Sequence, residues 1–190
     1  SKIWLSLAHM GGSEQEFVRE AFETNWVVPL GPNVDGFEHD LSQWLSTHCD
    51  REVHAVALSS GTAAIHLALI MLGVSKGDGS DSAKVSPLLR QPTPFVIGAT
   101  PIFVDSEPDT WNMDPVALEK AFEMYPEVGV VVAHLYGTSG KIDEIRAICR
   151  EHHAIIIEDA AESLGASYKG GGTNRGTFGS YNAILFNGNK

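Results

Sequence analysis

The chain has 190 residues, of which 43% are hydrophobic and 19% are charged, and its formal net charge is −11. This length and composition are typical of a globular protein that is large enough to bury a core. The negative charge argues against a nucleic-acid partner and against an anionic membrane, since both require a basic surface. It does not exclude a small anion held in a local pocket.

The cysteines and the hydropathy pattern indicate a compartment. Cys49 and Cys149 lie far apart, without metal-binding spacing, so we expect two reduced thiols in the core. No apolar run approaches the length of a membrane span, and the N-terminus lacks the charged-then-apolar pattern of a signal peptide. The sequence therefore predicts a cytoplasmic protein without a membrane partner.

The first half of the chain predicts two helices, a strand and a third helix. Ser13 and Glu16 form the pattern of a capping box ahead of apolar residues at helical spacing. The second helix carries four apolar residues on one face, namely Phe37, Leu41, Trp44 and Leu45. The apolar run 53–58 predicts a strand. It enters a turn of small residues, which opens the apolar helix 63–72.

The second half alternates strands and helices. Asp114 and Pro115 provide an N-cap and a first-turn proline for a helix that continues to about Tyr125. The remaining predicted elements are strands at 101–105, 130–133, 155–158 and 183–186, and a helix at 142–151. Strands separated by helices predict an α/β fold with a mostly parallel sheet and helices on both faces.

The turn Ser59-Ser60-Gly61-Thr62 is a candidate anion site. A helix N-terminus offers free backbone N–H groups and a favourable dipole, Gly61 allows close approach, and the Thr62 hydroxyl can donate. An ordinary N-capped helix explains the same residues, since Ser and Thr are preferred caps. The segment is neither a Walker loop nor a dinucleotide fingerprint. The phosphate site and the plain cap both remain open at this point.

A carboxylate and a lysine form the second candidate site. Asp159 follows the apolar strand at 155–158, and Lys190 ends a Gly/Asn-rich turn about thirty residues later. This pair suits pyridoxal phosphate (PLP), because a carboxylate can keep the pyridine nitrogen protonated and a lysine amine can form a Schiff base with the cofactor. His134, at the end of another predicted strand, could approach such a site or serve a structural role.

Several segments resemble, in order, the motifs of the DegT/StrS-type (DegT/DnrJ/EryC/StrS) sugar aminotransferases: SLAHMGGSEQEFV, VVPLGPNVDGFE, LSSGTAAIHLAL, PIFVDSEPDTWNMDP, AHLYGTSGKIDEI, IIIEDAAESLGASYKG and FNGNK. The resemblance implies a fold-type I PLP enzyme. It implies that Lys190 is the Schiff-base lysine, that Asp159 pairs with the pyridine nitrogen, and that Gly61 and Thr62 hold the phosphate. Glu162 would lie near the ring hydroxyl edge, where many relatives have Gln.

The resemblance also implies a reaction and an assembly. The reaction is amino transfer from an amino acid, typically glutamate, to a keto-sugar nucleotide in amino-sugar or cell-surface polysaccharide biosynthesis. A lysine at position 190 argues against the related sugar dehydratases, which have histidine there. Residues 1–190 would form the N-terminal part of the PLP-binding large domain, without the C-terminal small domain, and the full-length enzyme would be a homodimer. We expect no metal site, and no transaminase activity from residues 1–190 alone.

Two departures from the family pattern carry further expectations. In segment 79–97, polar residues and three prolines replace a buried strand and an aromatic residue that stacks on the cofactor, so the sheet would lose a strand. The unchanged length of this segment leads to the hypothesis of a compensated frameshift. At position 185 a leucine replaces a phosphate-binding serine, which predicts weaker phosphate binding.

Two alternatives remain open. The chain could be a catalytically inactive fragment or remnant of such an enzyme. It could also belong to a fold-type I PLP enzyme of different chemistry, such as a desulfurase or a small-amino-acid transaminase.

Overall fold

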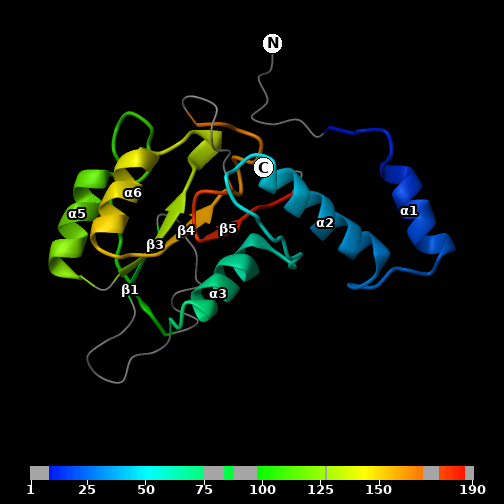
Figure 1. The fold of residues 1–190 in the computed structure, drawn as a ribbon, viewed down its shortest axis with the longest axis horizontal. Helices are drawn as coiled ribbons and strands as arrows, with labels where there is room; N and C mark the ends of the chain where they lie inside the picture. Colours follow the sequence, from blue (N-terminus) through cyan, green and yellow to red (C-terminus); the bar gives the residue numbers. More distant parts are fainter. Residues whose placement is uncertain (1–8, 75–83, 88–97, 127, 169–175, 187–190) are drawn as a thin grey trace, which may run out of the picture. The chain divides into compact units, whose positions relative to one another are not determined.

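The computed structural model describes residues 9–74, 84–87, 98–126, 128–168 and 176–186 (Figure 1). Lys190 and most of the segment 79–97 lie outside the described residues. The chain divides into two compact units: residues up to Ala57 together with Phe186, and residues 58–185. The predicted site residues other than Lys190 all belong to the second unit.

A parallel five-stranded sheet forms the centre of the second unit, with the strand order β2-β1-β3-β4-β5. The strands are β1 (Lys84–Pro87), β2 (Thr100–Pro101), β3 (Val128–Ala133), β4 (Ile156–Asp159) and β5 (Tyr181–Ala183). All four strand pairings are parallel, as predicted. The register aligns Ala133, Asp159 and Ala183 in one row at the carboxyl ends of β3, β4 and β5.

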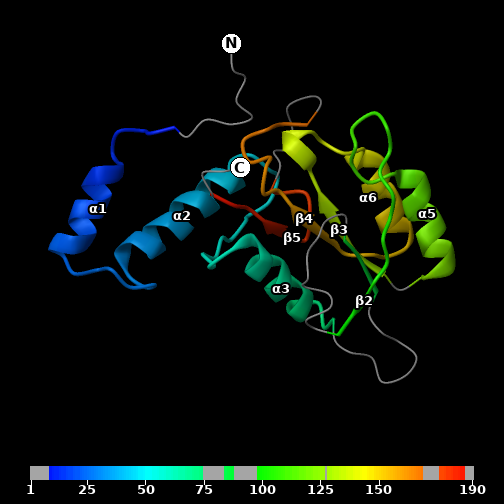
Figure 2. The ribbon, with the colours of Figure 1, turned by 180° about the vertical axis from the view of Figure 1, so that it is seen from behind.

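Helices cover both faces of this sheet, which confirms the predicted architecture (Figures 1 and 2). Helix α3 (Gly61–Met71) packs on one face, and helices α5 (Pro115–Met124) and α6 (Ile142–Glu151) pack on the other. Strand β3 is buried on both faces: Val130 and Val132 face α5 and α6, whereas Val131 faces α3. Because successive strand residues point to opposite faces, burial of both faces requires a continuous apolar run.

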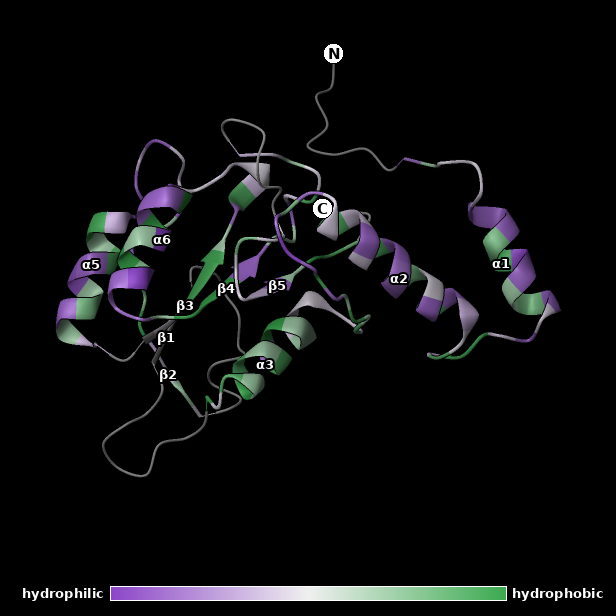
Figure 3. Cartoon of the chain, viewed as in Figure 1, coloured by the Kyte–Doolittle hydropathy of each residue, from purple (hydrophilic) through white to green (hydrophobic). Residues whose placement is uncertain are grey.

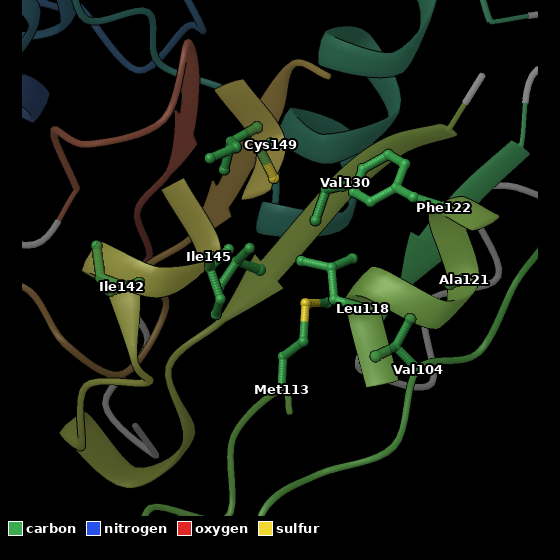
Figure 4. Packing of buried hydrophobic residues seen from close by; sticks show 11 residues of the cluster. Val104, Met113, Leu118, Ala121, Phe122, Val130, Ile142, Ile145 and Cys149 are labelled. Atoms are coloured by element: carbon green, nitrogen blue, oxygen red, sulfur yellow. The ribbon is translucent and has the colours of Figure 1, made fainter. Parts of the chain in front are cut away.

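The larger core lies between the sheet and the helices α5 and α6 (Figure 4). Its buried members are Val104, Met113, Leu118, Ala121, Phe122, Val130, Val132, Ile142, Ile145, Cys149 and Ile156. The smaller core joins α3 to the sheet through Ile65, Ala68, Leu69, Val74, Ala99, Val131, Ile157 and Ala183. Figure 3 shows the apolar colouring of β3 and of most of α3. Cys49 and Cys149 are both free, but only Cys149 is buried; Cys49 is half-buried and not a core thiol.

The predicted side-chain cap is present at α5 and absent at α1. Asp114 caps α5 as predicted, since its side chain accepts the Val116 N–H and Pro115 occupies the first turn. Ser13 is the N-cap of α1 (Glu14–Glu23), but in the structure its side chain makes no capping hydrogen bond. The Glu14 carboxylate accepts the backbone N–H groups of Gly11 and Gly12. The predicted capping box is wrong, because the Glu16 N–H donates to the Ser13 backbone carbonyl (3.0 Å) and not to the Ser13 side chain.

The predicted strand at 53–58 is also wrong. The segment is not a strand, and its residues 53–57 lie along helix α2 (Pro32–Ser46) within the first unit. The N–H groups of Val53, Ala55 and Ala57 donate, respectively, to the side chains of Ser46 (2.9 Å), Ser42 (2.8 Å) and Glu38 (2.7 Å). Four residues of helix advance about 6 Å and two extended residues about 6.6 Å, so the two repeats match. Side-chain oxygens thus satisfy the backbone groups that a sheet would have used.

The remaining differences concern the sheet. Strand β1 lies between β2 and β3, so the expectation that segment 79–97 costs the sheet a strand is wrong. Pro87 is the last residue of that strand. Residues 102–105 do not continue β2, and β5 ends at Ala183, where the prediction began a strand. Among the described residues, none of the helices has both the length and the hydropathy needed to cross a membrane.

Candidate functional site

Asp159 lies at the carboxyl edge of the sheet, as predicted. It is the last residue of β4 and is buried, its carbonyl accepts the His134 N–H, and its Oδ1 accepts the Ala161 N–H at 3.1 Å. Open parallel α/β sheets bind ligands outside the carboxyl ends of their strands. The position of Asp159 therefore fits a carboxylate that meets a cationic ring nitrogen.

Glu162 lies in the turn after β4 and connects it to the turn after β3. Its Oε2 accepts the backbone N–H of Tyr136 at 2.8 Å. Tyr136 has a left-handed backbone with φ 52°, and Gly137 follows with φ 73°. A Cβ at Gly137 would lie 3.1 Å from the Glu162 carbonyl oxygen, so the two turns approach closely. Glu162 and Asp159 thus occupy the same edge of the sheet.

Gly61 and Thr62 begin helix α3 beside the end of β5. Ser60 is the N-cap, and its side chain accepts the Ala63 N–H at 3.2 Å. Gly61 is buried against Leu185, and a Cβ at Gly61 would lie 2.9 Å from the Leu185 Cγ. Thr62 is exposed. The plain N-cap is therefore present, and the close approach that Gly61 allows is made by Leu185.

The sequence prediction missed a buried acid next to Asp159. The Glu158 side chain is fully buried and accepts the N–H groups of Gly176 (2.7 Å) and Phe178 (3.1 Å). His134 Nε2 lies 3.2 Å from Glu158 Oε1, an ion-pair distance, but neither ring nitrogen has a hydrogen-bond partner within the described residues. His134 is thus a buried residue beside the site. A carboxylate within an apolar strand indicates that other groups pair with it, because burial of an unpaired charge costs free energy.

A second polar cluster, also missed, lies between β2 and α5. Glu107 is buried; its carboxylate accepts from the Thr110 hydroxyl and lies 3.1 Å from Lys141 Nζ. The Thr110 hydroxyl is the largest of the causes that lower the pKa of the Glu107 carboxyl to about 2. Glu107 and then Asp109 raise the pKa of Lys141.

Asn112 is the fully buried member of this cluster. Its Oδ1 accepts the Leu135 N–H at 2.9 Å, and its Nδ2 donates to the carbonyls of Thr138 and Thr110, each at 3.1 Å. Among the described residues, no group of three His, Cys, Asp or Glu side chains could hold a metal ion.

Comparison with known proteins decides the family. A model of the DegT/DnrJ/EryC1/StrS aminotransferase family matches residues 9–190. The chain belongs to this family. The resemblance in the sequence motifs is thereby confirmed, and so is the prediction of an enzyme family that uses PLP.

Individual relatives support the assignment. EpsN of Bacillus subtilis (strain 168), whose name describes a pyridoxal phosphate-dependent aminotransferase, is 46% identical over 200 residues, which is 100% of this chain and 48% of EpsN. GDP-perosamine synthase of Caulobacter vibrioides is 31% identical over 189 residues, which is 100% of this chain and 49% of the synthase. The chain spans about half the length of these curated relatives.

A solved structure confirms the fold. The aminotransferase from Psychrobacter cryohalolentis is 28% identical and has a TM-score of 0.79, with 97% of this chain and 45% of that chain covered. The family member described here therefore has the α/β fold of fold-type I PLP aminotransferases.

The residues at the sheet edge fit PLP, whose phosphate is anionic and whose ring nitrogen is cationic. A buried carboxylate (Asp159) and a helix N-terminus (Gly61) lie at the same edge, so a negative charge can face the ring nitrogen and N–H donors can face the phosphate. Leu185, beside Gly61, is the exception to this fit.

Proposed function

We propose that residues 1–190 are the N-terminal part of the PLP-binding large domain of a sugar aminotransferase, and that the small domain lies in a further part of the protein. The reaction is the transfer of an amino group from an amino acid, glutamate in this proposal, to a keto-sugar nucleotide. The proposal rests on one observation: in a chain of this family, Asp159 and the N-terminus of α3 lie at the same edge of the sheet. The name of the perosamine synthase supports a sugar nucleotide as the acceptor.

The proposed roles follow from the chemistry of each side chain. When bound, PLP supplies an electron sink that lets an amino group leave one carbon and join another. Asp159 holds the ring nitrogen in its protonated form, and Glu162 meets the ring hydroxyl edge. Gly61 and Thr62 receive the phosphate at the start of α3. Lys190 would attach the cofactor through its amine, and the free amine would hold or move a proton at Nζ.

We also propose an oligomeric state and a cellular location. The active enzyme would be a homodimer in the cytoplasm, where the free thiols of Cys49 and Cys149 fit a reducing compartment. Size-exclusion chromatography with light scattering tests the dimer, and a monomeric active enzyme would overturn this part of the proposal.

The test uses the complete open reading frame that contains residues 1–190. The purified protein is incubated with PLP, glutamate and a panel of keto-sugar nucleotides, and mass spectrometry detects the amino-sugar nucleotide. We expect a product from the wild-type protein and none from Lys190→Ala. Borohydride reduction followed by peptide mapping should place the cofactor on Lys190. Attachment at Lys190 with activity only toward small amino acids or cysteine would favour a different fold-type I enzyme.

One observation favours the second candidate, a catalytically inactive relative. The Leu185 side chain packs against Gly61, where the proposal requires a phosphate. An inactive relative predicts no product with any acceptor and no borohydride-stable attachment of PLP. Either a product or an attached cofactor would overturn this alternative.

A further inference from the structure

We propose that Asn112 is a positioning residue for Glu162, acting through the turn after β3. The amide of Asn112 holds the ends of the segment Leu135–Thr138, and this segment presents the Tyr136 N–H to the Glu162 carboxylate. The importance of Glu162 for a cofactor rests on the proposed function. The positioning itself does not.

All the polar atoms of the Asn112 side chain are used. The carbonyl oxygen accepts from Leu135, and the amide nitrogen donates to Thr138 and to Thr110. Since an amide NH₂ has two protons, both donors have acceptors. The side chain is fully buried, so water cannot replace a lost partner. A substitution at position 112 should therefore alter the turn, because water cannot replace the hydrogen bonds that the amide makes.

The turn needs such support because of its backbone. Tyr136 has φ 52°, a left-handed conformation that a bulky residue adopts only when its surroundings hold it. The two residues bound by Asn112 lie on either side of Tyr136. The Thr138 N–H also donates to the Leu135 carbonyl at 2.9 Å, which closes the turn. Asn112 thus binds both ends of the segment that carries Tyr136.

Two further contacts hold Asn112 against this segment. Lys141, three residues after Thr138, lies 3.1 Å from Glu107, which belongs to the same loop as Asn112. A Cβ at Gly140 would lie 3.2 Å from the Cβ of Asn112, so the backbone passes close to the amide. The loop 107–112 and the segment 134–141 therefore form one polar unit, and Glu162 accepts a hydrogen bond from it.

Asparagine is specifically suited to this position. In Asn112→Asp the shape is kept, but two carboxylate oxygens replace one acceptor and one donor. One of them would then face the carbonyls of Thr110 and Thr138, which have no proton to share. We expect the Leu135–Thr138 turn to open while the apolar core stays packed, because Asn112 is not one of the residues that form this core.

Hydrogen exchange followed by mass spectrometry on the complete protein tests this inference. In Asn112→Asp, we expect exchange of the amides in a peptide covering residues 134–138 to become at least tenfold faster. Peptides from α5 and α6 should exchange as in the wild-type protein. Asn112→Ser, which is too short to span the turn, provides a second variant if Asn112→Asp does not fold. Unchanged exchange at 134–138, or a uniform increase over the whole sheet, would overturn the inference.

Asn182 provides a matched control. It also has a side-chain amide, but it lies in β5. Its Oδ1 accepts the Gly179 N–H at 2.9 Å, and its Nδ2 donates to the Gly179 carbonyl at 3.3 Å. Asn182→Asp should leave the exchange of residues 134–138 unchanged. If it accelerates that exchange as much as Asn112→Asp does, the effect is general and the inference fails.

A spectroscopic measurement separates this inference from the proposed function. The absorption spectrum of protein-bound PLP is recorded for the wild-type protein, Glu162→Gln and Asn112→Asp over a range of pH. If both positions act on the ring edge, both variants shift the spectrum in the same direction. A faster exchange in Asn112→Asp with no spectral change in Glu162→Gln would reject the cofactor role of Glu162 and leave the positioning role of Asn112 supported.

Discussion

The two sides of the candidate site differ in the contacts that their residues make. On one side, the carboxylates of Asp159 and Glu162 each accept a backbone N–H, from Ala161 and Tyr136 respectively. At the start of α3, the side chain of Leu185 packs against Gly61. The first side therefore presents carboxylates, whereas an apolar contact lies at the second. In the proposed site, these would be the ring side and the phosphate side, and only the phosphate side carries an apolar contact in place of a donor.

The largest expected effect is on the ring side. Asp159→Asn removes the negative charge that would hold a protonated ring nitrogen, and a hydrogen bond to a charged group contributes about 1.5–3 kcal/mol. We expect the affinity for PLP or the rate of amino transfer to fall about 10- to 100-fold. Asp105→Asn, at an exposed carboxylate of the same unit, is the control. Equal losses in the two variants would remove the distinction that we draw for Asp159.

A substitution at Gly61 examines the apolar contact. Gly61→Ala places a methyl group within 3 Å of Leu185, and we expect it to lower the free energy of unfolding by about 1–3 kcal/mol. Urea denaturation measures this change. Combining Gly61→Ala with Leu185→Ala removes the clash. The double variant should therefore recover most of the free energy of unfolding that Gly61→Ala loses. Full stability of Gly61→Ala alone would show that the two residues do not touch.

A hydroxyl at position 185 tests whether the phosphate side can be reopened. Leu185→Ser supplies a donor beside the α3 N-terminus, and we expect PLP to bind about tenfold more tightly, as measured by equilibrium dialysis. Leu185→Ala opens the same space without a donor and is the matched control. If serine and alanine give equal affinities, the leucine acts only as a steric block.

The smallest expected effect concerns the loop that supports the ring side. Hydrogen bonds, of which that from the Thr110 hydroxyl has the largest effect, lower the pKa of Glu107 to about 2, below its ordinary value of 4.5. A lowered folded-state pKa stabilises the fold above about pH 4.5, and this contribution is lost as the pH falls toward 2. Thermal unfolding from pH 6 to pH 2 should therefore be less pH-dependent in Glu107→Gln. The exposed residue Glu123, changed to Gln, serves as control, and an equal flattening there would contradict the assignment.

The elements that the sequence predicted correctly are those whose signals are local. The cap and proline at Asp114–Pro115, the apolar run of α3 and the pattern of α6 are each contained in one segment. The strand end at Asp159 was also predictable, because the apolar run stops there. The strand predicted at 53–58 failed because side chains of α2, at a matching repeat, satisfy its backbone. Propensity alone cannot distinguish these two partners.

The family and the alternation of strands and helices could be predicted from the sequence, and so could the residues that we propose for PLP chemistry. Each depends on the order of residues along the chain. The burial of Glu158 beside His134, the hydrogen bonds from Asn112 to the turn after β3, and the contact of Leu185 with Gly61 became known from the folded structure alone. These contacts join residues that are distant in sequence. Whether a buried polar group is satisfied depends on what folding brings next to it, and no local pattern contains that information.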